Sequence, residues 1–237
     1  MATATSAQPD QPGLRAIAPA WHTAVVLLVL FGLSALSARQ QSLPTFVGHG
    51  RAAAYLSVMA VEWLLTAFIW FGIQRRGMRL RELIGGSRPS VREVLRDLAI
   101  AVLFLIASHL VLALLGYLLK VTPSPGVRSL FPNGSTEIVL YVMLSFTAGI
   151  CEEILFRGYL QRQFAALTKS TAAGLILQGV AFGLAHGYQG KKYMLIIAVY
   201  GCLFGLLVYW RRSLRPGMTA HFVQDTLGGL VGRHFLK

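Results

Sequence analysis

Residues 149–158 read Gly-Ile-Cys-Glu-Glu-Ile-Leu-Phe-Arg-Gly, so two adjacent carboxylates and an arginine interrupt an otherwise apolar stretch. On a helix, Glu153 and Arg157 share one face and can pair. Glu152 is rotated by about 100° from Glu153, so the two acids cannot both point at Arg157, and one is available for another task. Each charge near the centre of a bilayer costs roughly 2.5–3.5 kcal/mol, so the three need a cavity, partners or water. The alternative is that the helix ends near Cys151 and that the charges lie at the membrane interface as ordinary pairs.

The composition of the 237-residue chain places this stretch in a membrane protein. Apolar residues make up 55% and charged residues 13%, and the mean hydropathy is +0.59. Both differ from the usage of soluble domains. Charge-free runs of spanning length cover 21–38, 98–119, 171–190 and 193–210. We therefore predict an all-α, polytopic membrane helical bundle with about seven transmembrane helices, whose first partner is the lipid bilayer.

The positive charge of the chain is interpreted as a topology signal. A net charge of +13 would indicate nucleic acid in a soluble domain. Here the basic residues fall mostly between hydrophobic segments, and seven of the 22 Lys and Arg residues crowd the connection 74–97. We therefore predict no nucleic-acid partner. By the positive-inside rule, the N-terminus and this connection lie on the cytoplasmic side of the plasma (inner) membrane.

Three parts follow one another along the chain. Residues 1–20, rich in Ala, Thr, Gln and Pro, predict a disordered tail. Residues 21–136 hold the N-terminal transmembrane helices and the arginine-rich connection, and residues 137–237 hold the region with the acidic pair. A weak signal-peptidase pattern at 34–38 lacks a basic leader, so we expect an uncleaved first helix. No sequence feature indicates a number of subunits.

Local signals predict where the helices begin and end. Helices are expected over about 21–38 and 53–73, and the capping-box pair Ser90 and Glu93 predicts another that starts at Val91 and runs to about 119. Leu83 and its apolar neighbours predict a short amphipathic piece on the membrane surface. Prolines and glycines make 121–134 a loop. Four further helices are expected, over about 137–167, 171–186, 193–210 and 218–235.

Two more polar groups lie in the helices that follow the acidic pair. His186 ends the pattern Phe182-x-x-x-His186, and His221 precedes Asp225 by four residues. That spacing puts His221 and Asp225 on one helix face, where the acid can orient the imidazole or both can bind one metal ion. Glu62, in the middle of the second helix, is predicted to face the bundle interior.

Six ionisable groups on three membrane segments are costly unless they gather in one hydrated cavity. In such a cavity a poorly solvated carboxylate is a better base, a histidine can relay a proton, and a polar pair can stabilise an oxyanion. The candidate residues are Glu152, Glu153, Arg157, His186, His221 and Asp225. The remaining histidines are predicted to be packing residues; they are His22, His49, His109 and His234.

In this order the three motifs resemble those of the CPBP family of intramembrane proteases, which includes the type 2 CAAX prenyl endopeptidases and the bacteriocin-processing or self-immunity proteins of the Abi group. The motifs are Glu-Glu-x-x-x-Arg at 152–157, Phe-x-x-x-His at 182–186 and His-x-x-x-Asp at 221–225. The resemblance covers roughly 137–233. It implies a glutamate-dependent endopeptidase that cuts a peptide or lipid-modified protein substrate, such as a prenylated C-terminal segment.

The resemblance also implies roles for the six residues. Glu152 would activate water with the help of His186, and Glu153 would pair with Arg157. His221 and Asp225 would stabilise the oxyanion. The family has Asn or Asp at the position of Asp225; where it is Asn, the side chain can donate a hydrogen bond, which an ionised Asp cannot. Either Asp225 is protonated, or it orients His221 and His221 alone is the donor.

Three alternatives remain at the level of sequence. A zinc-dependent form of the same protease would use the Glu, His and Asp side chains, but no HExxH pattern is present, and Cys151 and Cys202 form no CxxC pair; we expect no cofactor. A non-catalytic immunity or scaffold protein of the same family would not need the intact motifs. A proton- or ion-coupled carrier would show broken half helices or an inverted repeat, and neither is found.

The predicted topology raises one geometric difficulty. If the sixth helix spans the bilayer, His186 at the end of the fifth helix and His221 near the start of the seventh approach opposite membrane faces. They meet only if at least one lies well below its surface. A dipping 187–192 connection, a thinned bilayer or a longer lead-in before His221 would each allow this.

Overall fold

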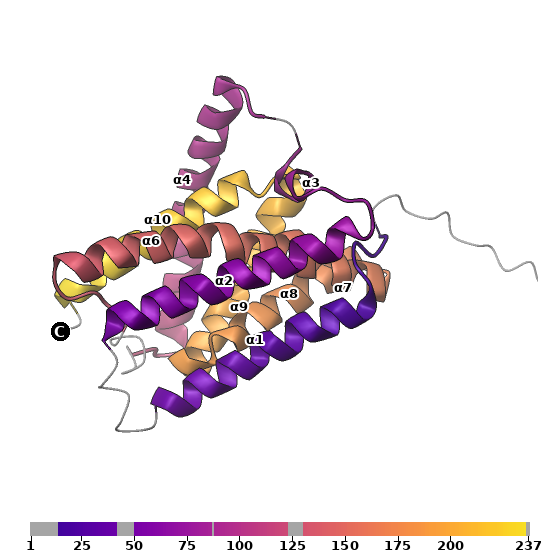
Figure 1. The fold of residues 1–237 in the computed structure, drawn as a ribbon. Coiled ribbons are helices and arrows are strands. Elements are labelled where there is room, and N and C mark those ends of the chain that lie inside the picture. The colour runs from indigo at the N-terminus through magenta and orange to yellow at the C-terminus, as the bar shows by residue number, and fades with distance from the viewer. Residues whose placement is uncertain (1–13, 42–49, 87, 123–129, 236–237) are drawn as a thin grey trace, which may run out of the picture.

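The computed structural model describes residues 14–41, 50–86, 88–122 and 130–235, and these residues form a bundle of helices without strands (Figure 1). The elements are α1 (Ala20–Gln41), α2 (Arg51–Gln74), α3 (Leu80–Ile84), α4 (Val91–Leu118), α6 (Ser135–Glu152), η2 (Glu153–Leu160), α7 (Gln161–Thr168), α8 (Thr171–Ala185), η3 (Gly187–Gln189), α9 (Lys191–Arg211) and α10 (Arg215–Phe235).

All seven predicted segments are helical, which confirms the all-α membrane bundle. Within the described residues, five helices are long and apolar enough to cross a membrane: α1, α2, α4, the continuous helix Ser135–Thr168, and α9. The fifth predicted segment, α8, is apolar but has only 15 residues. At 1.5 Å per residue it measures about 22 Å, shorter than the roughly 30 Å hydrocarbon core. α10 is not among the five.

The long helix that carries the acidic pair is α-helical at both ends and π-helical in the middle. α6 passes into η2 at Glu153, and the backbone N–H of Gln161 donates to the carbonyl of Phe156, five residues earlier. Such wider turns are rare and are frequently found at functional sites. All eight residues of η2 are buried. The alternative that the helix ends near Cys151 and leaves its charges at the interface is therefore wrong.

Glycines allow the helices around this segment to approach closely. In the bundle α6 packs against both α2 and α10 (Figure 1). A Cβ on Gly149 would lie 3.0 Å from both the backbone oxygen of Met218 and the backbone nitrogen of Phe222 on α10. Between α8 and α9, a Cβ on Gly179 would lie 2.9 Å from the backbone oxygen of Ala198. Small residues at such positions are typical of packed membrane helices.

The N-terminal segment joins the core earlier than predicted. Residues 1–13 lie outside the described residues, so the predicted tail is not tested there. The backbone N–H groups of Ile17 and Ala18 donate to Oε1 of Gln163 at 2.7 and 3.2 Å, and the Gln163 amide donates back to the Ala18 carbonyl at 3.0 Å. One buried amide side chain thus fixes residues 17 and 18, which were predicted as part of the tail.

The histidines outside the motifs differ from one another. His22 is a buried packing residue as predicted: its Nδ1 contacts the Tyr159 hydroxyl at 2.7 Å and its Nε2 the Phe68 carbonyl at 2.9 Å. His109 and His234 are exposed, so the packing prediction is wrong for them. His49 lies outside the described residues.

The arginine-rich connection contains the predicted capping box and a short helix. The Glu93 N–H donates to Ser90 Oγ at 3.3 Å, and the Ser90 N–H donates to the Glu93 carboxylate at 2.8 Å, which starts α4 at Val91 as predicted. The short helix α3 is present, but Leu83 is fully buried in the main core cluster. α3 packs against η2, so protein covers the side that was expected to face the membrane surface.

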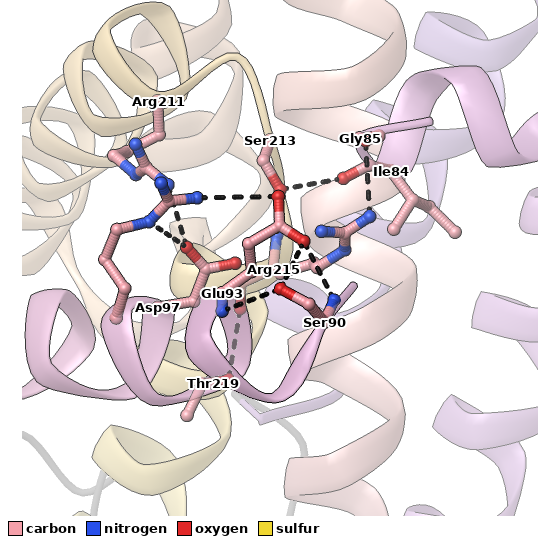
Figure 2. Close-up of polar contacts among 10 residues, drawn as sticks. Ile84, Gly85, Ser90, Glu93, Asp97, Arg211, Ser213, Arg215 and Thr219 are labelled. Atoms are coloured by element: carbon pink, nitrogen blue, oxygen red, sulfur yellow. Dashed lines mark hydrogen bonds and ion pairs between the residues drawn. The ribbon is translucent and has the colours of Figure 1, made fainter. Parts of the chain in front are cut away.

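The same connection holds the turn between α9 and α10 (Figure 2). The Leu214 N–H and the Ser213 hydroxyl both donate to the Ile84 carbonyl, at 2.9 and 3.1 Å. Arg211, at the end of α9, pairs with Asp97 of α4 at 2.9 Å. These contacts fix the start of α10, the helix that carries His221.

Candidate active site

A buried ion pair forms the base of the site. Glu153 Oε1 and Arg157 Nη1 are 2.9 Å apart, and both side chains are completely inaccessible to solvent. The guanidinium carbon of Arg157 lies 4.2 Å from the ring centroid of Phe182 and 4.8 Å from that of Phe204. Aromatic faces attract a cation, so these two rings take the place of water around the guanidinium. The predicted pairing of Glu153 with Arg157 is present in the structure.

The carboxylate of Glu153 also lies beside the first turn of α10. A Cβ on Gly217 would be 3.0 Å from Glu153 Oε2, so only a glycine leaves room for the acid there. The positive end of a helix dipole favours a negative charge near its first turn. Helix α10 therefore helps to keep a fully buried carboxylate in place.

His221 connects the ion pair to two further acids. Its Nδ1 is 3.1 Å from Glu153 Oε1. On the other side of the ring, Nε2 is 3.6 Å from Glu152 Oε2 and 3.5 Å from Asp225 Oδ2. Since an ionised carboxylate only accepts, the Nδ1–H of His221 donates to Glu153. The structure thus brings together four of the six predicted residues, namely His221 and the three acids around its imidazole. A fifth, Arg157, pairs with Glu153.

The acids around His221 differ in their access to solvent. The Glu153 side chain is 0% exposed, whereas those of Glu152 and Asp225 are 17% and 35% exposed. Glu153 thus belongs to the buried, paired part of the cluster. Glu152 and Asp225 are partly exposed on the Nε2 side of the imidazole, and Oε2 of Glu152, the oxygen nearest to Nε2, is itself buried without a hydrogen-bond partner among the described residues.

His186 lies at the edge of this cluster rather than inside it. Its ring centroid is 4.7 Å from that of Phe182, which in turn is 6.1 Å from that of His221. In the described part of the chain His186 makes no ion pair with the acids. Its Nδ1 donates to the Phe182 carbonyl at 2.8 Å, because a carbonyl oxygen can only accept. In the neutral ring, Nε2 is then the nitrogen that can accept a proton.

Two features of the helices remove the predicted conflict in depth between the two histidines. α8 is short, so a helix that begins at one bilayer surface ends below the other, with His186 as its C-cap. α10 begins at Arg215, six residues before His221, which is a lead-in of about 9 Å along the helix. Both imidazoles therefore reach the ring of Phe182.

Sequence reasoning did not assign two further polar residues to the site. Glu62 was expected to face the interior, and it interacts electrostatically with Glu152 and Asp225; its Oε2 is buried without a hydrogen-bond partner among the described residues. Tyr188 of η3 interacts with Glu62, Glu152 and Asp225. An acid in the middle of a membrane helix was a signal for Glu62, whereas a tyrosine in a short connection gave none.

The residues present were also considered as a metal site. Among the described residues, no three His, Cys, Asp or Glu side chains are grouped so that they could hold a metal ion. His221 Nδ1 is occupied by the Glu153 carboxylate. The only described histidine nitrogen that faces two acids is Nε2 of His221.

The fold and the site together define a polytopic helical membrane protein with a cluster of acids and imidazoles inside the bundle. Comparison with protein-family models matches residues 134–227 to the family described as type II CAAX prenyl endopeptidase Rce1-like. Over these residues, which make up less than half of the chain, the protein is similar to this family of CAAX-type proteases, in agreement with the resemblance of the three motifs. All six candidate residues lie within the match, and Glu62 lies outside it. No curated protein and no solved structure matches the chain.

Proposed function

We propose that the protein is an intramembrane endopeptidase that hydrolyses a peptide bond of a membrane-associated substrate with water activated by Glu152. The observation that carries the proposal is that the two adjacent acids differ in burial and in pairing. Glu153 is fully buried and paired, while Glu152 is partly exposed and lies beside His221 Nε2. A general base must be both held in place and reachable by water.

The proposed reaction proceeds in two steps. Glu152 takes a proton from a water molecule whose oxygen bonds to the scissile carbonyl carbon, and the carbonyl oxygen becomes an oxyanion. When this intermediate collapses, the C–N bond breaks and the proton held by Glu152 passes to the leaving amine. His186, through Nε2, assists the first proton transfer. His221 donates to the oxyanion from Nε2 as the doubly protonated imidazolium that its three neighbouring acids favour, since its Nδ1–H already donates to Glu153.

In this proposal Glu153 and Arg157 are positioning residues. Glu153 fixes the orientation of the His221 ring through Nδ1, in the way that a carboxylate orients a catalytic histidine. Arg157 neutralises Glu153, so this acid does not compete for the water. The proposal uses no metal.

The substrate class follows from the family and not from the site alone. We propose a peptide or a lipid-modified protein, including a prenylated C-terminal segment, that reaches the site from the bilayer. We also propose that the N-terminus and the connection 74–97 face the cytoplasm. Labelling of single cysteines placed in that connection, in intact cells, tests the orientation.

The test uses purified protein in liposomes with a fluorogenic peptide that ends in a prenylated CAAX sequence, and the same peptide without the lipid. We expect one cleavage site by mass spectrometry. Glu152→Ala and His186→Ala should each lower the rate about 10²–10⁴-fold while the melting temperature is kept. Wild-type protein that cuts neither peptide would favour the scaffold or carrier alternatives.

The zinc-dependent form is tested on the same preparation. Treatment with a strong chelator, followed by removal of the chelator, should leave both the cleavage rate and the melting temperature unchanged. Elemental analysis should find less than one zinc per chain. Loss of activity that only added metal restores would replace the metal-free mechanism.

A further inference from the structure

The proposed hydrolysis needs a second oxyanion donor when Asp225 is ionised. His221 can donate from Nε2, but an ionised Asp225 has no hydrogen to give. Oxyanion sites commonly combine two donors, and loss of one costs about 10²–10³-fold in kcat. A second donor must lie on the side of the cluster where Glu152 and Asp225 are accessible.

Tyr188 lies at this side of the cluster. It belongs to η3, two residues after His186, and its ring centroid is 6.0 Å from that of His186. Its hydroxyl oxygen accepts a hydrogen bond from the Gln189 amide at 3.1 Å. Because a tyrosine hydroxyl both accepts and donates, its own hydrogen remains for another acceptor.

The charges near Tyr188 are the accessible acids of the site. Its hydroxyl interacts electrostatically with Glu152, Asp225 and Glu62, from α6, α10 and α2. Burial of the ring raises the pKa of Tyr188, the Gln189 amide lowers it, and the three carboxylates raise it further. The hydroxyl therefore keeps its proton throughout the ordinary pH range and stays a donor.

The geometry points to Tyr188, which lies beside His186, as the second donor to the oxyanion. This inference rests on the proposed function and deepens it. η3 is in the 187–192 connection, so the short α8 would serve a catalytic purpose: it brings this connection down to the depth of the acids.

Tyr200 is the rival donor on the opposite side. Its hydroxyl is buried beside Ser108 and interacts with Asp225, Glu153 and Arg157. The last two are completely inaccessible, and of the two accessible acids only Asp225 is among the groups with which Tyr200 interacts, whereas Tyr188 interacts with both Glu152 and Asp225. It provides a matched control, because Tyr200→Phe removes the same atom.

The experiment measures kcat and KM of wild type, Tyr188→Phe, Tyr200→Phe and Glu152→Ala on one reporter, together with melting temperatures. We expect Tyr188→Phe to lower kcat about 10²–10³-fold with little change in KM, and Tyr200→Phe to stay near wild type. An active wild type with an equally active Tyr188→Phe overturns this inference alone, and so does a loss confined to Tyr200→Phe. An inactive wild type overturns the proposed function and this inference with it.

A binding measurement covers the case in which Tyr188→Phe melts early. A peptide phosphonate carries a tetrahedral anionic centre and imitates the intermediate. At a temperature below both melting points, Tyr188→Phe should bind the phosphonate about 10²-fold more weakly than wild type, and the uncleaved peptide equally well. Equal binding of the phosphonate by both proteins would contradict the role of Tyr188.

Discussion

Replacement of Arg157 by methionine removes the buried cation and keeps an apolar side chain between Phe182 and Phe204. The Glu153 carboxylate, which is 0% exposed, then lacks the guanidinium that lies 2.9 Å from it and neutralises it in the wild type. Removing one partner of a buried ion pair costs about 3–5 kcal/mol, because the other charge stays buried. Methionine still packs against the two rings, so no cavity adds to the loss. We therefore expect the free energy of unfolding to fall by about 3–5 kcal/mol.

The assay is thermal unfolding in one detergent, followed by intrinsic fluorescence. For a chain of this size, about 2–4 °C per kcal/mol converts the loss to a fall of about 6–20 °C in melting temperature. The double variant Glu153→Gln/Arg157→Met removes both charges of the pair and should recover at least half of the fall. With the single variant Glu153→Gln measured as well, the cycle should give a coupling energy of about 1–3 kcal/mol.

A control separates this effect from a general loss of arginine. Arg75 is exposed and lies over the ring of Phe71 at 4.5 Å. Arg75→Met therefore loses a cation–π contact without uncovering a buried charge, and should cost no more than about 1 kcal/mol. If Arg157→Met melted no earlier than Arg75→Met, or if the double variant were the least stable of all, the buried ion pair would not be what holds this part of the core.

Three further outcomes follow from contacts around the site. Gly149→Ala places a Cβ 3.0 Å from backbone atoms of α10. It should lower kcat at least about tenfold, because it separates Glu152 from His221. The control is Gly116→Ala, whose Cβ meets open space, and it should match wild type in kcat and melting temperature. Asp97→Asn breaks the 2.9 Å pair with Arg211 and should cost about 1.5–3 kcal/mol, read as a lower melting temperature. Gln163→Ala removes three hydrogen bonds to residues 17 and 18, and should expose the segment before α1 to limited proteolysis while α1 itself stays protected.

The helices were predictable because local signals decide them. The charge-free runs gave the membrane segments, and Ser90 with Glu93 gave the start of α4, since a capping box is a contact between residues three apart. The pairing of Glu153 with Arg157 was predictable for the same reason: its partners are four residues apart on one helix. Family resemblance then supplied the interpretation of the motifs, and residues 134–227 match a model of the type II CAAX prenyl endopeptidase Rce1-like family.

Contacts between distant segments were beyond the reach of such signals. The contact of His221 Nδ1 with Glu153 joins residues far apart in the chain; sequence reasoning predicted that both lie in one cavity but not that they contact each other. The amide of Gln163 that fixes Ile17 carries no pattern either. Nor does sequence periodicity reveal a π-helical stretch, because a widened turn depends on what packs around η2.

The position of His186 was decided by helix length. The charge-free run continues to Gly190 in the sequence, the helix was expected over about 171–186, and it ends at Ala185. The backbone leaves the helix at His186 and passes into η3, which brings Tyr188 to the acids. A connection of three residues has no period from which such a placement could be predicted.

The role of Glu152 is tested most directly by the single-turnover rate of Glu152→Gln on the cleavable reporter in liposomes. Glutamine keeps the size of the side chain and cannot take a proton from water. The proposed mechanism predicts a rate about 10²–10⁴-fold below wild type, with the same melting temperature and the same affinity for the phosphonate peptide. A Glu152→Gln protein that cleaves at the wild-type rate would contradict it.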